Sequence, residues 1–289
     1  MPLARLSRCR EVDGPEVRPL AVCGSRRGPF DPGGPDAGPD AGLVPGDGVG
    51  IAEVAAQAGR SGPLRSRTKE SSMKVFIIGI GGGVGLRLAR RLVARGDQVD
   101  GLLRRAATRE RLAAEGIAAA PGDLVAMSVP ELAAAMRGAD AIVFTAGAGG
   151  RGGPEATAQV DGEGPGKVAA AAELAGIRRF VLVSVFPEAW RERRMNEAFE
   201  RYMVAKKLAE TRLVLTDLDW IVLRPSALSD APGVGTVDLG LAKVHDEIRR
   251  DDVAATIAEL LRRPEVGRVI LEVTGGATPI ADAVAAMTP

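Results

Sequence analysis

The sequence predicts an α/β fold in which a mostly parallel sheet is covered by helices on both faces. From Met73 onward, short apolar runs rich in β-branched residues alternate with segments whose apolar residues recur at helical spacing. Strands buried on both faces have such nearly continuous apolar runs. The first run also leads directly into a glycine-rich loop, Gly79–Gly85, that opens a helical segment. This order is typical of a doubly wound sheet.

Seven strands are expected, each followed by a helix whose apolar residues lie three or four positions apart. The expected strands are Lys74–Ile80, Val99–Leu103, Ile117–Ala120, Ala141–Thr145, Phe180–Ser184, Trp220–Leu223 and Val269–Val273. The expected helices cover residues 84–96, 108–115, 132–137, 168–174, 196–215, 252–262 and 281–286. Only 64 residues follow Pro225, so we expect a small C-terminal portion on the substrate side.

The composition divides the chain near Met73. Residues 1–72 hold 9 of the 19 prolines and 12 of the 37 glycines, which is 21 of 72 positions and is typical of disorder. We therefore expect residues 1–72 to be a disordered extension, or Met73 to be the true translation start. An AAG-GAG coding of Lys69-Glu70 would place a ribosome-binding sequence just ahead of Met73. Residues 73–289 are expected to form one domain.

Charge and composition exclude several classes of function. Lys and Arg number 38 and Asp and Glu 37, a net charge of +1, which argues against a nucleic-acid-binding surface. No uncharged apolar stretch of about 18 to 20 residues predicts a membrane span. A single histidine, His245, and two early cysteines argue against a metal site. Without a secretory signal, we expect a cytoplasmic monomer or homodimer that acts on a small-molecule substrate.

The glycine loop allows two registers. Gly79, Gly82 and Gly85 give the spacing GxxGxxG, whereas Gly81 and Gly83 give only part of a GxGxxG fingerprint. We favour the first register. Gly79 then lies where the strand must turn, Gly82 where the backbone approaches a pyrophosphate, and Gly85 where the helix packs close to the sheet. A merely flexible loop is the alternative.

The segments on either side of the loop's helix suggest which dinucleotide binds. Amides of the first helical turn, at Gly83 and Val84, would bind phosphate oxygens. Arg104 and Arg105 end the second expected strand, where an NAD enzyme usually has an acidic residue for the ribose hydroxyls. Arginine would instead pair with a 2′-phosphate. The sequence therefore favours NADP over NAD, with two solvent-exposed arginines as the alternative reading.

Several further motifs follow the glycine loop in order: Gly122-Asp123-Leu124, Gly138–Gly147 (GADAIVFTAG), Val160-Asp161, Ala175–Ser184 (AGIRRFVLVS), Tyr202–Lys206 (YMVAK), Leu223-Arg-Pro225 and Asp252-Val-Ala254. Together they resemble the atypical branch of the short-chain dehydrogenase/reductase superfamily, whose members are NAD(P)-binding, sugar-epimerase-like or NmrA-like. The resemblance covers residues 73–289 and implies a Rossmann-type fold. It also implies cofactor contacts at Asp123, Leu124, Thr145, Ala146, Gly147, Lys206 and Pro225.

Tyr202 and Lys206 are four residues apart on an expected helix and therefore share one face. Tyr202 is the only tyrosine, and a phenol of ordinary pKa about 10 is a poor acid–base group unless a nearby ammonium lowers its pKa. The resemblance implies that Tyr202 exchanges a proton with the substrate oxygen, that Lys206 also binds the nicotinamide ribose, and that Ser184 helps to hold that oxygen. An ordinary helix tyrosine and a strand-end serine bonded to backbone are the alternatives.

The implied chemistry is hydride transfer between the nicotinamide and a small carbonyl or alcohol substrate. Two other classes compete with it: a non-catalytic NAD(P)-sensing regulator, and a flavin or quinone reductase whose acceptor takes hydride directly. The YxxxK spacing favours the oxidoreductase. Ser184 favours the other two, because apolar Val185 and Phe186 follow it where active relatives often have the catalytic hydroxyl.

Overall fold

The computed structural model describes residues 72–103, 106–187, 189 and 193–288. The prediction for residues 1–72 falls almost wholly outside this part of the chain. So do Arg104 and Arg105, which were expected to select NADP. The structural statements below concern the described ranges alone.

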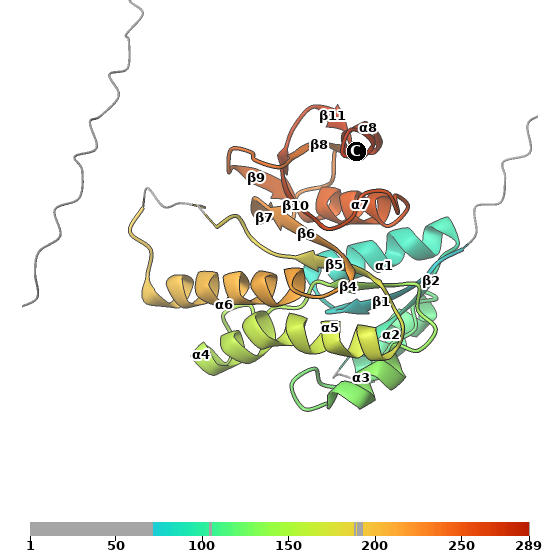
Figure 1. Ribbon diagram of the computed structural model, residues 1–289. Coiled ribbons are helices and arrows are strands. Elements are labelled where there is room, and N and C mark those ends of the chain that lie inside the picture. Colours follow the sequence, from blue (N-terminus) through green and yellow to red (C-terminus); the bar gives the residue numbers. More distant parts are fainter. Residues whose placement is uncertain (1–71, 104–105, 188, 190–192, 289) are drawn as a thin grey trace, which may run out of the picture. The chain divides into compact units, whose positions relative to one another are not determined.

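A nine-stranded sheet forms the centre of residues 72–288 (Figure 1), in the order β11-β8-β10-β6-β5-β4-β1-β2-β3. All neighbours from β10 to β3 are parallel. These seven strands are β1 (Lys74–Ile78), β2 (Gln98–Leu103), β3 (Ala120–Pro121), β4 (Ala141–Phe144), β5 (Arg179–Val183), β6 (Asp219–Pro225) and β10 (Val269–Gly275). Six of them coincide with expected strands, so the predicted mostly parallel sheet is confirmed. The third expected strand, over residues 117–120, is wrong in its bounds, because β3 is only two residues long and shares only Ala120 with it.

The expected strand count of seven is too low. β8 (Thr236–Gly240) and β11 (Thr278–Pro279) extend the sheet as antiparallel strands beyond β10. β7 (Ala227–Ser229) and β9 (Glu247–Arg249) form a separate parallel pair. The four strands have two to five residues, so they lack the continuous apolar runs that mark the buried strands. Their pairing depends on tertiary contacts rather than on a local pattern.

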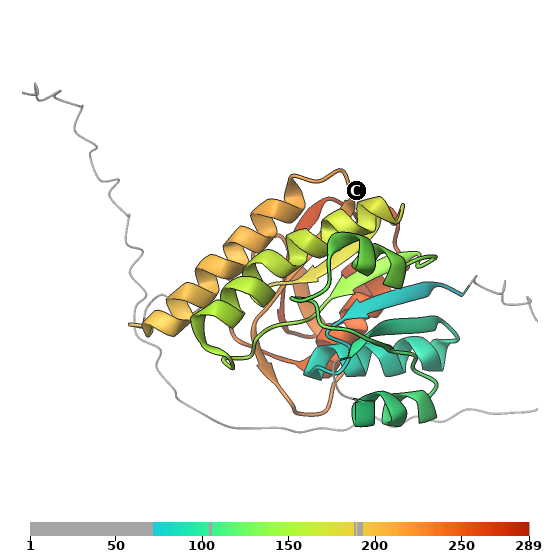
Figure 2. The ribbon, with the colours of Figure 1, turned by 90° about the horizontal axis from the view of Figure 1, so that it is seen from below.

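Helices cover both faces of the sheet, as predicted (Figure 2). Val75 and Ile77 of β1 pack in one apolar core, and the intervening Phe76 and Ile78 pack in the other. The first core includes residues of α1 (Gly83–Arg95), α2 (Ala106–Ala114), α7 (Arg250–Leu260) and α8 (Ile280–Ala285). The second includes residues of α3 (Val129–Ala135), α5 (Gly164–Leu174) and α6 (Glu197–Val214).

The segment before α5 contains a helical form that the sequence pattern did not reveal. α4 (Gly153–Ala156) runs directly into the π-helix η1 (Thr157–Glu163), which continues into α5. π-Helical turns are rare and are frequent at functional sites. None of the helices in the described ranges has the length and apolar character needed to cross a membrane.

The strand order places the candidate site. From β1 the chain proceeds through β2 and β3 toward one edge, and from β4 through β5 and β6 toward the other. The direction reverses between β1 and β4. In open α/β sheets, ligands bind outside the carboxyl ends of the strands at such a switch point. β1 and β4 end at Ile78 and Phe144, so the loops after these residues border the predicted crevice.

Candidate functional site

The glycine loop turns sharply at the end of β1. Gly79 has a φ of +88°, and a Cβ on it would lie 2.6 Å from the backbone nitrogen of Ala146. The amide of Gly82 donates to the Gly79 carbonyl oxygen at 2.8 Å. A Cβ on Gly85 would overlap that same oxygen and lie 2.8 Å from Thr145 Oγ1. The geometry therefore fits the GxxGxxG register, with little room for side chains at the first and third positions.

α1 begins immediately after this turn. Gly82 is its N-cap residue and makes no side-chain capping bond, so amides of the first turn point outward from the helix end. Val84 is 7% exposed and packs in the apolar core. Any contact of Val84 with a ligand is thus made by its amide rather than its side chain. A Cβ on Gly83 would lie 2.8 Å from Arg250 Cδ, which places an arginine beside the helix start.

Basic side chains near the start of α1 are held by acidic ones. Arg87 donates to the Gly83 carbonyl oxygen at 2.9 Å and pairs with Asp230 at 3.2 Å and with Asp251 at 3.6 Å. Arg250 also pairs with Asp230, at 3.1 Å. The sequence analysis did not single out these residues as site residues.

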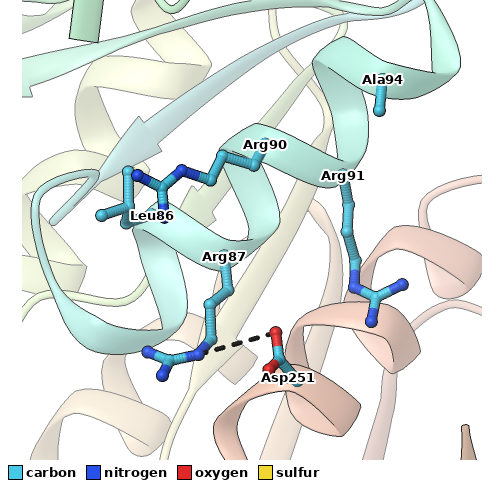
Figure 3. Close-up of a pocket in the computed structure, with 6 residues that line it drawn as sticks. All are labelled: Leu86, Arg87, Arg90, Arg91, Ala94 and Asp251. Carbon is cyan, nitrogen blue, oxygen red and sulfur yellow. Dashed lines mark ion pairs between the residues drawn. The ribbon is translucent and has the colours of Figure 1, made fainter. Parts of the chain in front are cut away.

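An open groove follows the outer face of α1 toward α7 (Figure 3). Leu86, Arg87, Arg90, Arg91, Ala94 and Asp251 line it. Arg90 is occupied by two hydrogen bonds to Glu115, of 2.7 and 3.0 Å. Because none of the predicted site residues lines this groove, we place the site at the carboxyl ends of β1, β4 and β5 instead.

The loop after β4 packs against both the glycine turn and η1. Thr145 Oγ1 donates to the carbonyl oxygens of Ile78 and Gly79, at 3.1 and 3.3 Å. The amide of Ala148 donates to Asp161 Oδ2 at 3.0 Å. Of the expected cofactor residues, Thr145 and Ala146 therefore lie beside the glycine loop and Gly147 lies against Asp161. Their contacts with a cofactor stay predictions.

Lys206 lies on α6 and reaches the end of β5. Its side chain is buried, and Nζ donates to the Val183 carbonyl oxygen at 2.8 Å. Burial lowers the pKa of the Lys206 ammonium, while the negative charges of Asp161 and Glu210 raise it.

Tyr202 precedes Lys206 by one helical turn, but its predicted ionisation differs in the structure. Burial raises the pKa of the Tyr202 phenol above its ordinary value, and the charge of Asp161 raises it further. The expected lowering of this pKa by Lys206 is therefore wrong. At neutral pH Tyr202 is a protonated phenol, which can donate a proton.

Ser184 is not a free hydroxyl at the end of β5. Its Oγ donates to Glu210 Oε1 at 2.5 Å, so its partner is a carboxylate rather than the backbone that the alternative reading expected. Arg224 binds the same carboxylate through Nε at 3.0 Å and Nη2 at 2.6 Å. Glu210 is eight residues after Tyr202 and four after Lys206. This spacing puts Glu210 on the same helical face as Tyr202 and Lys206, and it is the sequence pattern from which Glu210 could have been found.

The remaining predicted cofactor residues have local partners. Asp123 Oδ1 accepts from the amide of Val125 at 2.8 Å and so stabilises its own turn. The Leu124 carbonyl oxygen accepts from Lys167 Nζ at 3.0 Å. Pro225 ends β6 and pairs with β10. Their contacts with a cofactor stay predictions.

Comparisons with known proteins agree with this geometry. The sequence profile of the NAD(P)H-binding family matches residues 79–264. YhfK of Bacillus subtilis, named an uncharacterized sugar epimerase, is 38% identical over 212 residues, which are 73% of this chain and 98% of YhfK. A Bacillus halodurans structure described as an NAD-dependent epimerase/dehydratase is 30% identical with a TM-score of 0.68, and covers 74% of this chain and 100% of its own. ChuY, titled an anaerobillin reductase from Escherichia coli O157:H7, is 29% identical with a TM-score of 0.59, and the match covers 70% of this chain and 96% of ChuY.

Proposed function

Because the chain belongs to the NAD(P)H-binding family, we propose that it is an NADP-dependent oxidoreductase. It transfers hydride between the nicotinamide and a small carbonyl or alcohol substrate. The observation that carries the proposal is the buried Lys206, whose Nζ lies 2.8 Å from the carbonyl oxygen at the end of β5, with Tyr202 one turn away on α6. Both residues lie on α6, and Lys206 reaches the carboxyl end of β5.

We infer the role of each residue from its position and from the family resemblance. The glycine turn and the amides at the start of α1 hold the diphosphate. Bound nicotinamide supplies or accepts the hydride. Tyr202, protonated at neutral pH, donates a proton to the substrate oxygen when a carbonyl is reduced. Lys206, one helical turn after Tyr202 on α6, binds the ribose. The preference for NADP rests on Arg104 and Arg105.

A second function has one observation in its favour. The hydroxyl of Ser184 already donates to Glu210, so it is not positioned to hold a substrate oxygen as the resemblance implies. A reductase whose flavin or quinone acceptor takes hydride directly needs neither that hydroxyl nor a tyrosine acid. The similarity to ChuY, titled a reductase, supports reductive chemistry of this kind. A regulator that binds the dinucleotide without turnover is the third candidate.

The test begins with fluorescence titrations of NADPH and NADH, followed by a panel of carbonyl and quinone acceptors. We expect NADPH to bind more tightly, and Tyr202→Phe to lower carbonyl turnover by about 10²-fold or more with unchanged dinucleotide affinity. Lys206→Met should lower both the carbonyl turnover and the dinucleotide affinity. Lys207→Met is the matched control, because Lys207 is an exposed neighbour on the same helix.

Each contrary result points elsewhere. Carbonyl turnover that survives Tyr202→Phe would exclude the acid role of Tyr202. Turnover of quinones alone, unaffected by that substitution, would favour the second function. Tight dinucleotide binding with no turnover on any acceptor would favour the regulator. A cytoplasmic monomer or homodimer is part of the same proposal, and sedimentation would measure its oligomeric state.

A further inference from the structure

One buried carboxylate has no part in the function proposed above. Asp161 lies in η1 and is 2% exposed. Burying an ionisable group costs free energy unless partners satisfy it, and a π-helical turn is an unusual place to keep one. The groups around Asp161 therefore indicate what it does.

The first partner of Asp161 is the loop after β4. The amide of Ala148 donates to Oδ2 at 3.0 Å, and a Cβ on Gly147 would lie 2.9 Å from Oδ1. The backbone of the loop thus lies directly against the carboxylate. Five of the seven residues from Gly147 to Gly153 are glycine, so the loop has high conformational freedom of its own. The bond from Ala148 restricts that freedom.

The second set of partners lies on α6. A Cβ on Gly162 would lie 3.4 Å from Ala205 Cβ, so η1 and α6 pack closely beside Asp161 and Lys206. The charge of Asp161 raises the pKa of Lys206 and also that of Tyr202. Glu210 is the other acid that raises the pKa of Lys206. The ionised form of Asp161 therefore favours the ammonium form of Lys206 and the phenol form of Tyr202. Burial raises the pKa of Asp161 itself, and the bond from Ala148 and the charge of Lys206 oppose that rise.

We propose that Asp161 is a positioning residue that holds the loop after β4 against η1 and places a carboxylate against the part of α6 that carries Tyr202 and Lys206. The inference rests on the proposed function, because it assigns Asp161 a role toward the two α6 residues that act there. Asp161 acts through these neighbours rather than on the substrate.

Asp161→Asn tests the electrostatic half. Asparagine keeps the shape and an oxygen that can accept from Ala148, but it removes the charge. Loss of that charge lowers the pKa of both Tyr202 and Lys206, so the alkaline limb of the kcat/KM profile should move to lower pH by about 1 unit. The Kd for NADPH should change less than about threefold. Glu163→Gln is the matched control, because Glu163 is an exposed carboxylate of the same π-helix, and it should leave the profile unchanged.

Asp161→Ala tests the anchoring half without any assay of turnover. Arg151 is exposed within the glycine-rich loop, so trypsin cleavage after it reports how often the loop opens. We expect Asp161→Ala to be cut at Arg151 at least about tenfold faster than the wild type, since the bond from Ala148 is lost. Asp161→Asn should be cut at the wild-type rate. Mass spectrometry of the fragments identifies the site.

The outcomes separate this inference from the proposed function. Loss of carbonyl turnover in Tyr202→Phe, together with a wild-type alkaline limb in Asp161→Asn, would overturn the electrostatic role alone. Equal cleavage of Asp161→Ala and the wild type at Arg151 would overturn the anchoring role. Failure of the proposed function would be seen instead as turnover that survives Tyr202→Phe. A loss of activity in Asp161→Asn that is the same at every pH would indicate a structural role only.

Discussion

The hydroxyl of Ser184 donates to a carboxylate that Arg224 already holds by two hydrogen bonds. The Glu210 and Arg224 side chains are only 6% and 15% exposed. A buried pair of this kind is strongly destabilised by loss of one charged partner, whereas loss of a neutral third group is tolerated far better. At this position the three residues form a structural link between β5, α6 and β6.

We therefore predict that Ser184→Ala lowers the free energy of unfolding by only about 1 kcal/mol and changes kcat/KM for a carbonyl substrate less than about threefold. Glu210→Ala should cost about 3 kcal/mol or more, because it removes the carboxylate that accepts both hydrogen bonds from the buried Arg224 guanidinium and leaves it the longer ion pair with Glu272, at 3.6 Å. Urea unfolding and steady-state kinetics measure the two effects. A hundredfold fall of kcat/KM in Ser184→Ala with unchanged dinucleotide affinity would return Ser184 to the catalytic role that the resemblance implies.

At the scale of elements, the glycines on either side of α1 separate two reasons why a position requires glycine: a positive φ and a lack of room for a side chain. Gly79 and Gly96 precede and follow α1, and both have positive φ, +88° and +92°. A Cβ on Gly79 would meet backbone atoms of Ala146 from 2.6 Å, whereas one on Gly96 would meet nothing within 4 Å. The two positions thus have nearly the same φ but differ in the room available to a side chain.

We predict that Gly96→Ala costs about 1–2 kcal/mol of stability through its backbone conformation alone and leaves NADPH affinity unchanged. Gly79→Ala should cost about 1–3 kcal/mol more, because the loop after β4 must move away, and it should weaken NADPH binding at least about tenfold. Thermal unfolding and fluorescence titration measure both variants. Equal effects of the two substitutions on affinity would contradict a binding role for the turn at Gly79.

The parts of this site that could be predicted are those whose residues lie close together in the sequence. The glycine turn and the Tyr202–Lys206 pair are local, so motif and helical spacing were enough to find them. Six of the parallel strands were predictable because burial on both faces demands continuous apolar runs, whereas β3 is two residues long and not buried. The bond from Ala148 to Asp161 and that from Ser184 to Glu210 join separate elements, and only the packing of η1 and α6 brings these residues together. No local pattern contains that information.

At the scale of the described chain, Arg179 links the sheet to the end of α7 at the amino ends of the strands, opposite the candidate site. It begins β5 and is 8% exposed. Nη1 donates to Asp219 Oδ2 and to the Val266 carbonyl oxygen, both at 2.7 Å. Nη2 donates to the carbonyl oxygens of Leu260 and Arg263, at 2.8 and 2.9 Å. One guanidinium thus joins β5, β6, the end of α7 and the turn before β10.

We predict that Arg179→Met lowers the free energy of unfolding by about 3–5 kcal/mol, because it removes the buried cation that pairs with Asp219 and donates to three carbonyl oxygens. The carbonyl oxygens of Leu260 and Arg263 keep a backbone amide as a second donor, so most of this cost comes from Asp219 and Val266. Arg179→Lys should recover only part of the loss, since an ammonium lacks the planar fork that serves four acceptors. Exposed Arg178 makes a single bond to Asp217 O at 2.9 Å, so Arg178→Met is the control and should cost at most about 0.5 kcal/mol.

The position of Arg179 also predicts how Arg179→Met binds NADPH. In the parallel part of the sheet, all strands have their amino ends on one side and their carboxyl ends, where the candidate site lies, on the opposite side. The fraction of Arg179→Met that stays folded should therefore bind NADPH with wild-type affinity, as titration below its unfolding temperature would measure. A folded Arg179→Met that has lost this affinity would mean that the amino-end network controls the geometry of the glycine turn. Stability and cofactor binding would then not be separable in this fold.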